Sequence, residues 1–220
     1  MKKIINILVV LLPWFIKRRV LNYFYKYDIH PSARIGLSYI FPDKLKMESG
    51  SRIGHLNVAI HLHYIEMGED ATISQQNWIT GFPIDGKGFF EEYPNRTPQL
   101  LMGKDSAITK RHLVDCTDSV SIGEYTSIGG YASQILSHST SLEHNRQGCA
   151  PIHIGHHCFV GTRSVILPGS ALPSQSVLGA GALLNKRFTE SFVLYGGVPA
   201  KKIDTMRRDL IFFHREYRPK

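Results

Sequence analysis

A six-residue repeat between Ile154 and Leu184 constrains the fold more than any other feature of the sequence. An aliphatic residue returns at every sixth position, and a small residue stands four places after each of the first five. The aliphatic series is Ile154, Val160, Ile166, Leu172, Leu178 and Leu184, and the small series is Cys158, Ser164, Ser170, Ser176 and Ala182. Helices and single half-buried strands have shorter periods, so neither fits. A period of six is typical of a parallel β-helix, in which each aliphatic residue points into a shared core.

Shorter blocks with the same period precede this stretch. A coil buries its inner face only against the coils above and below it, so the repeat should recur along the chain. The blocks are Met47, Ile53, Ala59 and Ile65; Met67, Ile73 and Ile79; Met102, Ile108 and Val114; and Ile122 and Ile128. A two-residue slip resets the phase between Ile65 and Met67 and again between Val120 and Ile122. The sequence therefore predicts an all-β solenoid in a single domain.

Several motifs resemble the hexapeptide-repeat acyltransferases, the group of the galactoside, maltose and serine acetyltransferases, and in particular its capsule and exopolysaccharide O-acetyltransferases. The motifs are PIHIGHHCFVGTRSVILPGSALPSQSVLGAGALLNK followed by LYGGVPAKKI, HPSARIG, and CTDSVSIGEYTSIGGYASQILSHS. The resemblance implies a left-handed parallel β-helix, a homotrimer with sites between subunits, and acetyl-CoA as acyl donor with no metal requirement. The left hand rests on the resemblance alone, because crossover connections are normally right-handed.

The domain plan follows from where the repeat holds and where it fails. We expect an N-terminal apolar and basic helical segment over residues 1–28, a β-helix domain over residues 29–198, and a C-terminal helix over residues 199–220. Loop insertions are expected at about 80–101 and 134–151, where the repeat breaks. The C-terminal helix is predicted from Ile203, Met206, Leu210 and Phe213, which recur at three and four, and it should cap the open end of the solenoid.

The N-terminal segment is apolar from Ile4 to Ile16, interrupted by Asn6 and Pro13. It is too short to span a bilayer, which takes ~20 apolar residues, and no small-residue cleavage site follows it. Two interpretations remain: a helix lying in the membrane interface, or a helix packed on the solenoid or a partner subunit. The net charge of +8, concentrated toward both ends, suggests anionic neighbours such as phosphate-bearing ligands or lipid rather than nucleic acid, for which no recognition motif is present. We expect the bacterial cytoplasm, at the inner face of its membrane.

The second break in the repeat carries the expected chemistry. In the acyltransferases, a histidine just after the coil that precedes the inserted loop is the general base, and His138 in LSHS matches it; Ser139 stands where the family often has proline. An imidazole has a pKa near neutrality, so it can accept the proton of a sugar hydroxyl as that oxygen attacks a thioester. Glu143, Asp115 and a backbone carbonyl are all possible partners that would hold the ring in one tautomer.

The resemblance also implies residues for the two substrates. His112 and Asp115 resemble the coil edge that faces the acceptor, although an aspartate also suits a β-helix corner, and Arg146 could meet an anionic substrate. For the donor, the matching positions are Phe159 near the pantetheine arm, Gly161 and Thr162 beside the thioester, Ala180 as a backbone contact, and Lys186 near the phosphates of CoA.

The predicted activity is acetyl transfer to a saccharide hydroxyl in the biosynthesis of a surface polysaccharide. One alternative is a metal hydratase resembling the γ-class carbonic anhydrases, because eleven histidines are a rich supply of ligands; the spacing of His138 and His144 does not match that family. A second alternative is a non-catalytic β-helix scaffold, which would lack a base at the root of the loop.

Overall fold

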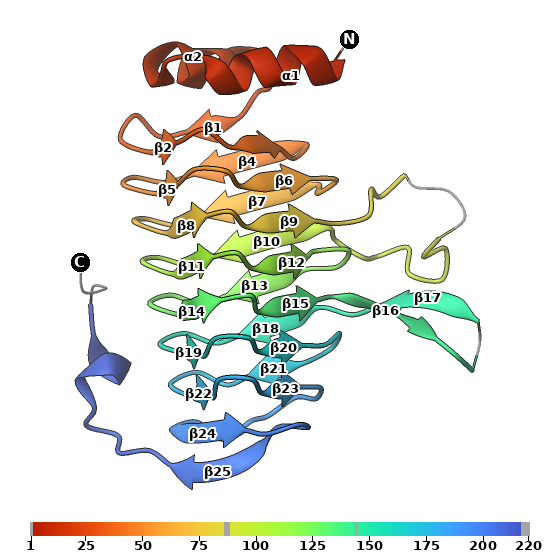
Figure 1. Ribbon diagram of the computed structural model, residues 1–220, viewed down its shortest axis with the longest axis vertical. Helices are drawn as coiled ribbons and strands as arrows, with labels where there is room; N and C mark the ends of the chain where they lie inside the picture. The colour runs from red at the N-terminus through yellow and green to blue at the C-terminus, as the bar shows by residue number, and fades with distance from the viewer. Residues whose placement is uncertain (1, 86–88, 144, 217–220) are drawn as a thin grey trace.

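The computed structural model describes residues 2–85, 89–143 and 145–216, and these form a solenoid with a helical hairpin across one end (Figure 1). The coils have three flat sides, and each side contributes one strand per turn to a parallel sheet. We call the sheets A, B and C in the order in which the chain visits them.

Each sheet stacks one strand from successive coils. Sheet A has the order β1 (Asp28–Ile29), β4 (Lys44–Met47), β7 (Tyr64–Met67), β10 (Gln99–Met102), β13 (Val120–Ile122), β18 (Ile152–Ile154) and β21 (Ala171–Leu172). Sheet B has the order β2 (Arg34–Ile35), β5 (Arg52–Ile53), β8 (Thr72–Gln75), β11 (Ala107–Lys110), β14 (Ser127–Tyr131), β19 (Phe159–Val160), β22 (Val177–Leu178), β24 (Val193–Gly196) and β25 (Lys201–Thr205). Sheet C has the order β3 (Tyr39–Phe41), β6 (Val58–Ile60), β9 (Trp78–Thr80), β12 (Leu113–Asp115), β15 (Gln134–Leu136), β20 (Val165–Ile166) and β23 (Leu183–Leu184).

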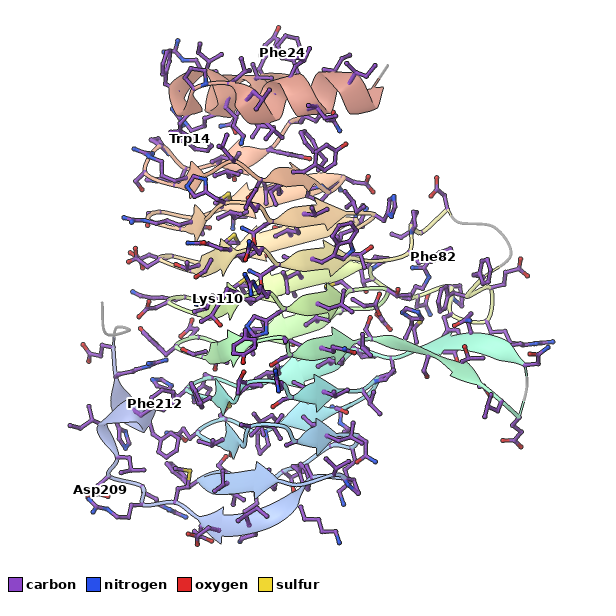
Figure 2. The ribbon with its side chains drawn as sticks, viewed as in Figure 1. Trp14, Phe24, Phe82, Lys110, Asp209 and Phe212 are labelled. Carbon is purple, nitrogen blue, oxygen red and sulfur yellow. The ribbon has the colours of Figure 1, made fainter. Side chains whose placement is uncertain are left out.

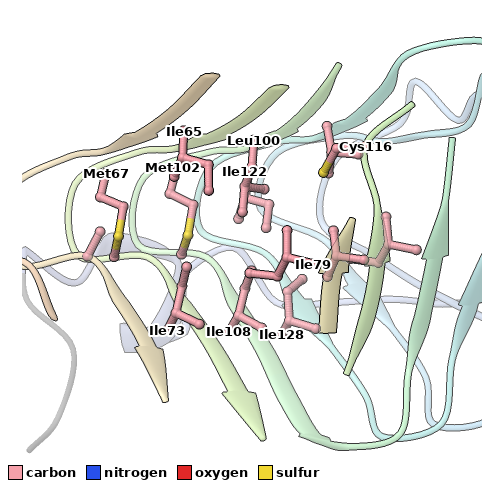
Figure 3. Close-up of a cluster of buried hydrophobic side chains, with 14 of the residues drawn as sticks. Ile65, Met67, Ile73, Ile79, Leu100, Met102, Ile108, Cys116, Ile122 and Ile128 are labelled. Carbon is pink, nitrogen blue, oxygen red and sulfur yellow. The ribbon is translucent and has the colours of Figure 1, made fainter. Parts of the chain in front are cut away.

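The repeat residues form the core, as the sequence predicts. All six aliphatic residues of the last coils are completely buried, and so are the small residues between them, at no more than 1% exposed. Figure 3 shows the same arrangement in the middle coils, where Ile65, Met67 and Ile73 stack beneath their counterparts in the next turn. Because Val160 pairs with Leu178 and Ile166 with Leu184, a turn of these coils is three runs of six residues.

The phase slips in the sequence have a structural cause. Strands of sheet A in the earlier coils bury two side chains instead of one, as β7 does with Ile65 and Met67 and β13 with Val120 and Ile122. A side with two inward residues is two residues longer, since side chains alternate between the faces of a strand. The chain therefore keeps its register while the sequence repeat appears to shift.

A column of polar side chains runs along the edge between sheets B and C. Asn57 Nδ2 donates to Asn77's counterpart carbonyl at Ser74, and the Asn57 Oδ1 atom accepts from the backbone N–H of Asn77 at 2.9 Å. Asn77 Oδ1 in turn accepts from the backbone N–H of His112 at 2.9 Å. The column gives buried backbone groups at this edge their hydrogen-bond partners, so it fixes one coil on the next.

The N-terminal segment forms two helices, α1 (Lys2–Leu11) and α2 (Trp14–Phe24), with Pro13 at the N-cap of α2. Proline lacks the N–H that a continuing helix would need, so the apolar stretch from Ile4 to Ile16 bends into a hairpin. Val9 and Leu21 are buried against the first coil. None of the described helices is long and apolar enough to cross a membrane.

The predicted C-terminal helix is wrong. Residues Lys201–Thr205 form β25, which pairs antiparallel with β24 at the end of sheet B, and only a short 3-10 helix follows at Ile211–His214. The backbone of β24 would otherwise leave its outer edge unpaired, and β25 satisfies it. Of the four residues that suggested a helical face, only Phe213 is buried, whereas Ile203 is 61% exposed.

Candidate active site

Both insertions leave the solenoid at the edge between sheets C and A, which we call the C/A edge. The first occupies residues 81–98 between β9 and β10, and the second occupies residues 137–151 between β15 and β18. The predicted boundaries were slightly wide, because β15 continues to Leu136. The second insertion is a hairpin of β16 (His138–Ser141) and β17 (Arg146–Cys149), and the two insertions project on the same side of the molecule (Figure 1).

One coil turn lies between the two insertions, and it holds the predicted base. Asp115 ends β12 at this turn, and His138 opens the hairpin one coil further on. His138 Nδ1 lies 2.6 Å from Asp115 Oδ2, while the Asp115 carboxylate is 5% exposed and the His138 side chain 40% exposed. Of the three partners that the sequence left open for His138, the structure selects Asp115.

Asp115 is held by more than the imidazole. Its Oδ2 atom accepts hydrogen bonds from the backbone N–H groups of Ser137 and His138, at 3.0 and 3.1 Å, and its Oδ1 atom accepts from the Thr117 hydroxyl at 2.7 Å. The turn therefore fixes the carboxylate before the histidine adds its own bond. A carboxylate fixed in this way leaves the ring a single favourable orientation.

The pKa values of the pair move in opposite directions. The hydrogen bond to Asp115 raises the pKa of His138 above its usual value, although burial works the other way. Burial would raise the pKa of the Asp115 carboxyl, but the hydrogen bonds from His138, Thr117 and Ser137 outweigh it and the pKa is lowered. Asp115 is therefore ionised near neutrality, and the neutral ring keeps its proton on Nδ1. The lone pair then sits on Nε2, which is the arrangement of a general base.

The first insertion packs against the histidine through an aromatic residue. The ring of Phe90 meets the His138 ring edge to face, with the centroids 5.9 Å apart, and Phe90 also contacts Phe82. Phe90 is 6% exposed, so it walls one side of the imidazole.

Arg96 fixes this insertion to the solenoid. Its guanidinium is buried and donates to the backbone carbonyls of Phe82 at 2.6 Å, Thr117 at 3.1 Å, and Pro83. It also lies over the Phe90 ring, 5.0 Å from the centroid. Arg96 thus ties both ends of the insertion to the turn that carries Asp115.

A hollow of about 470 Å³ lies between the two insertions. Its walls come from both: Phe89, Phe90, Glu91, Glu92, Thr140, Asn145, Arg146 and Gln147. Arg146, predicted to meet an anionic substrate, forms an ion pair with Glu92 across the rim. The mix of aromatic faces, carboxylates and amides suits a ligand with many hydroxyl groups.

His112 has a different environment from the one predicted. It is 1% exposed, its Nδ1 accepts from the backbone N–H of Ser133 at 3.1 Å, and its Nε2 lies 2.9 Å from the Thr109 hydroxyl. Burial lowers the pKa of His112 to about 4, although a hydrogen bond with the backbone of Gly130 opposes this. His112 is a step in the polar column between sheets B and C, so it has no surface to offer an acceptor.

The predicted donor residues fall into two groups. Phe159 lies in β19 on sheet B, and Gly161, Thr162 and Ala180 lie at the corners that follow β19 and β22, on the edge between sheets B and C. We call this the B/C edge. A Cβ atom at Gly161 would come within 2.5 Å of the Ala180 backbone nitrogen, so the coils approach closely there. Lys186 follows β23 and lies on the C/A edge, two coils from His138. Within one chain, therefore, His138 and most of the donor residues lie on different edges.

Sequence reasoning missed Thr117 and Arg96. Thr117 follows Asp115 by two residues, a spacing at which a hydroxyl often bonds an aspartate in a turn, and this could have been read from the sequence. Arg96 stands in a proline-rich loop with no local signal for burial. Among the described residues, no three His, Cys, Asp or Glu side chains are arranged to hold a metal ion, and His144 lies outside the described residues.

Comparison with known proteins supports the resemblance in sequence. No protein-family model matches the chain. Over 69 residues, 31% of this chain, it is 33% identical to the galactoside O-acetyltransferase of Escherichia coli, and this match covers 34% of that protein. The match thus spans about a third of the length of the curated relative.

Two solved structures have a similar fold. One is a hexapeptide-repeat acetyltransferase from Vibrio cholerae, with a TM-score of 0.53 and 20% identity over 64% of this chain and 73% of that one. The other is AntD, an N-acyltransferase from Bacillus cereus in complex with dTDP-4-amino-4,6-dideoxyglucose and coenzyme A, with a TM-score of 0.56 and 13% identity over 76% of this chain and 84% of that one. The fold of this chain is therefore the left-handed parallel β-helix of the hexapeptide-repeat acyltransferases, the family that its sequence resembles.

Proposed function

We propose that this protein is an acyltransferase that moves an acetyl group from acetyl-CoA to a hydroxyl of a saccharide, in the making of a bacterial surface polysaccharide. The observation that carries the proposal is the pair of Asp115 and His138 at the root of the second insertion. A non-catalytic solenoid would have no need of a buried carboxylate that fixes the tautomer of a partly exposed imidazole beside a hollow. The pair thus favours an enzyme over a scaffold.

In the proposed mechanism, His138 Nε2 takes the proton of the acceptor hydroxyl while that oxygen attacks the thioester carbonyl carbon. The C–S bond breaks, the ester forms, and the proton on His138 passes to the departing sulfur, so the products are the acetylated saccharide and free CoA. Asp115 stabilises the imidazolium between the two proton transfers without itself being protonated, because its pKa is lowered. General-base catalysis of this kind contributes typically ~10²–10⁴ in rate.

The hollow between the two insertions is the proposed acceptor site. It adjoins the His138 ring through Phe90, and its aromatic and polar lining suits the apolar face and the hydroxyl groups of a sugar. Among similar proteins, the one from Escherichia coli is described as acting on a galactoside, and AntD was solved with a nucleotide-linked amino sugar and coenzyme A. These descriptions support a sugar acceptor and a CoA thioester donor here.

A homotrimer follows from the placement of the donor residues. The donor residues at the B/C edge and the base at the C/A edge lie on different edges of one chain, so one site needs the B/C edge of a neighbouring subunit. A closed ring of three such heterologous contacts gives each base one donor groove. We place the reaction in the cytoplasm, where acetyl-CoA is made, with the N-terminal helices at the inner face of the membrane.

Titration with acetyl-CoA tests this proposal, comparing the wild type with His138→Ala. Release of free CoA is followed over a panel of sugars and nucleotide sugars. Both proteins should bind the coenzyme, and only the wild type should release CoA with an acceptor at a rate well above background. His30→Ala is the matched control, because His30 is exposed near the first coil, away from both insertions. Equal CoA release from wild type and His138→Ala would remove the role of His138, and failure of both to bind acetyl-CoA would remove the donor.

A further inference from the structure

The N-terminal hairpin of α1 and α2 is inverted with respect to water. The side chains that it turns toward the solenoid include Asn6 and Lys17, which are 5% and 3% exposed. The side chains that it turns outward are large and apolar, between 59% and 71% exposed: Ile4, Leu8, Leu11, Phe15, Tyr23 and Phe24. Figure 2 shows Phe24 pointing away from the solenoid, whereas Trp14 lies on its inner side. A surface helix in water has the opposite arrangement.

Specific hydrogen bonds hold the polar side inward. Asn6 Nδ2 donates to the Tyr39 hydroxyl at 3.2 Å, and the Tyr25 hydroxyl donates to Asn6 Oδ1 at 2.7 Å. Lys17 Nζ donates to the Gly36 carbonyl at 2.8 Å, and burial lowers its pKa to about 8. Turning the hairpin over would leave these groups without their partners. The outward position of the apolar side chains is thus built into the fold, and it exposes a patch larger than single scattered hydrophobic residues would make.

The charge of the hairpin indicates what covers this patch. No Asp or Glu occurs before Asp28, while residues 1–27 contain six Lys or Arg. Arg19 and Lys26 are exposed beside the apolar side chains, and Lys26 lies over the Tyr23 ring at 5.0 Å from its centroid. Apolar side chains flanked by cations, with no acid among them, match the chemistry of an anionic lipid surface.

We propose that the outer face of the α1–α2 hairpin docks flat on a bilayer that contains anionic lipids. The described helices do not span, so they would lie in the interface, with the apolar side chains ~5–10 Å deep at the boundary of headgroups and acyl chains. Arg19 and Lys26 then meet the phosphate groups. This docking stands on the hairpin alone and does not depend on the catalytic role of His138.

Docking sets the height of the candidate active site above the membrane. The hairpin lies across the end of the solenoid, so the stack of coils would stand away from the bilayer (Figure 1). From β3 to β15 there are four steps in sheet C, and steps of ~4.8 Å plus a helix layer of ~10 Å place His138 roughly 30 Å from the outer face of the hairpin. If the proposed function holds, the acceptor is a lipid-linked saccharide modified several sugars away from its lipid.

The full-length protein should co-sediment with vesicles of phosphatidylcholine and phosphatidylglycerol, more strongly than with phosphatidylcholine alone, and added salt should weaken the binding. Leu8→Glu combined with Phe15→Glu should reduce the bound fraction at least tenfold. Ile211→Glu is the matched control, because Ile211 is 85% exposed at the opposite end of the solenoid, and it should bind as the wild type does. In a Phe24→Trp variant, the added tryptophan should be quenched by brominated lipid.

Three results would overturn the lipid assignment. The wild type might not sediment with either vesicle, or Leu8→Glu with Phe15→Glu might bind unchanged. The third result is a lower oligomer mass for this double variant in the absence of lipid, which would show that a second copy of the chain covers the patch. Far-ultraviolet circular dichroism and the melting temperature of each variant show that it is folded. CoA release on soluble sugars, measured in parallel, shows separately whether the transferase proposal holds.

Discussion

Asp115 has two tasks, and both act through the same carboxylate. It accepts the backbone N–H groups of Ser137 and His138, which shape the root of the hairpin, and it accepts the Nδ1–H of the imidazole. The backbone bonds keep the carboxylate in place whether or not the ring is protonated. Asp115 is therefore a positioning residue, whose effect on the proposed reaction comes through His138.

Asp115→Asn separates the charge of this residue from its shape. The amide can still accept the backbone bonds through its oxygen, but its NH₂ group would face His138 Nδ1 and favour the tautomer with the proton on Nε2. We expect kcat to fall by ~10²–10⁴, by analogy with the same change in serine protease triads. The rate of CoA release measured against pH provides the test.

The direction of the pH effect is fixed by the raised pKa of His138. The base must be neutral to act, so the wild-type rate should rise with pH through a pKa above the usual value of an imidazole. Removing the negative charge lowers that pKa, and the acid limb in Asp115→Asn should move to lower pH. A variant profile that falls in amplitude but keeps its acid limb would mean that Asp115 has only a structural role.

His112 and His138 show why residue type alone does not identify a base. Both follow coil strands in the sequence, and both have an oxygen-bearing partner within 3 Å. The difference is burial: His112 is 1% exposed within the polar column, and its lowered pKa keeps it neutral. Burial depends on whether the neighbouring coil continues or gives rise to an insertion, which spacing along the chain does not reveal for a single residue.

At the scale of elements, the first insertion depends on one buried cation. Arg96→Met keeps the length of the side chain but removes its bonds to the Phe82, Pro83 and Thr117 carbonyls. Buried carbonyls left without donors cost about 1–3 kcal/mol each, so we expect about 2–4 kcal/mol of lost stability and a lower melting temperature. KM for the acceptor should also rise, while acetyl-CoA affinity stays unchanged.

Arg146→Ala is the control for the stability effect. Arg146 pairs with Glu92, but their side chains are 64% and 57% exposed, and such a surface pair contributes about 0–1 kcal/mol. Thermal unfolding of both variants tests the contrast. If the two arginine variants melt at the same temperature, Arg96 does not anchor the insertion.

The elements differ in how far the sequence could predict them. The inward residues of the coils repeat, so their period reports the core directly, and even the slip at Ile65 and Met67 was visible before its cause. The C-terminal helix was predicted from four residues at helical spacing, but the free edge of β24 offered backbone partners that no local pattern shows. The pairing of His138 with Asp115 joins residues 23 positions apart, and it required the coils to be stacked.

At the scale of the whole molecule, the proposed site is divided between two edges. The base and the hollow lie at the C/A edge, whereas Thr162 and Ala180 lie at the B/C edge. A chain that acted alone would need a donor long enough to reach across sheet C. Association of three chains in a ring brings each C/A edge to the B/C edge of a neighbour and gives three equal sites.

Mixing two inactive variants tests this arrangement. His138→Ala removes the base, and Ala180→Trp fills the proposed donor groove from an exposed position without touching the core. Each homotrimer should be inactive. A mixed trimer has one interface in which an intact base faces an intact groove, so co-expression in equal amounts should restore about a quarter of the wild-type activity.

A dilution experiment distinguishes shared sites from sites within one chain. Wild type co-expressed with an equal amount of the chain that carries both substitutions should also retain about a quarter of the activity if each site needs two intact neighbours. Sites confined to single chains would leave about half of the activity in this mixture and none in the mixture of single variants. That second pair of results would contradict the trimer proposal while leaving the roles of His138 and the donor groove intact, because each edge would then serve its own chain.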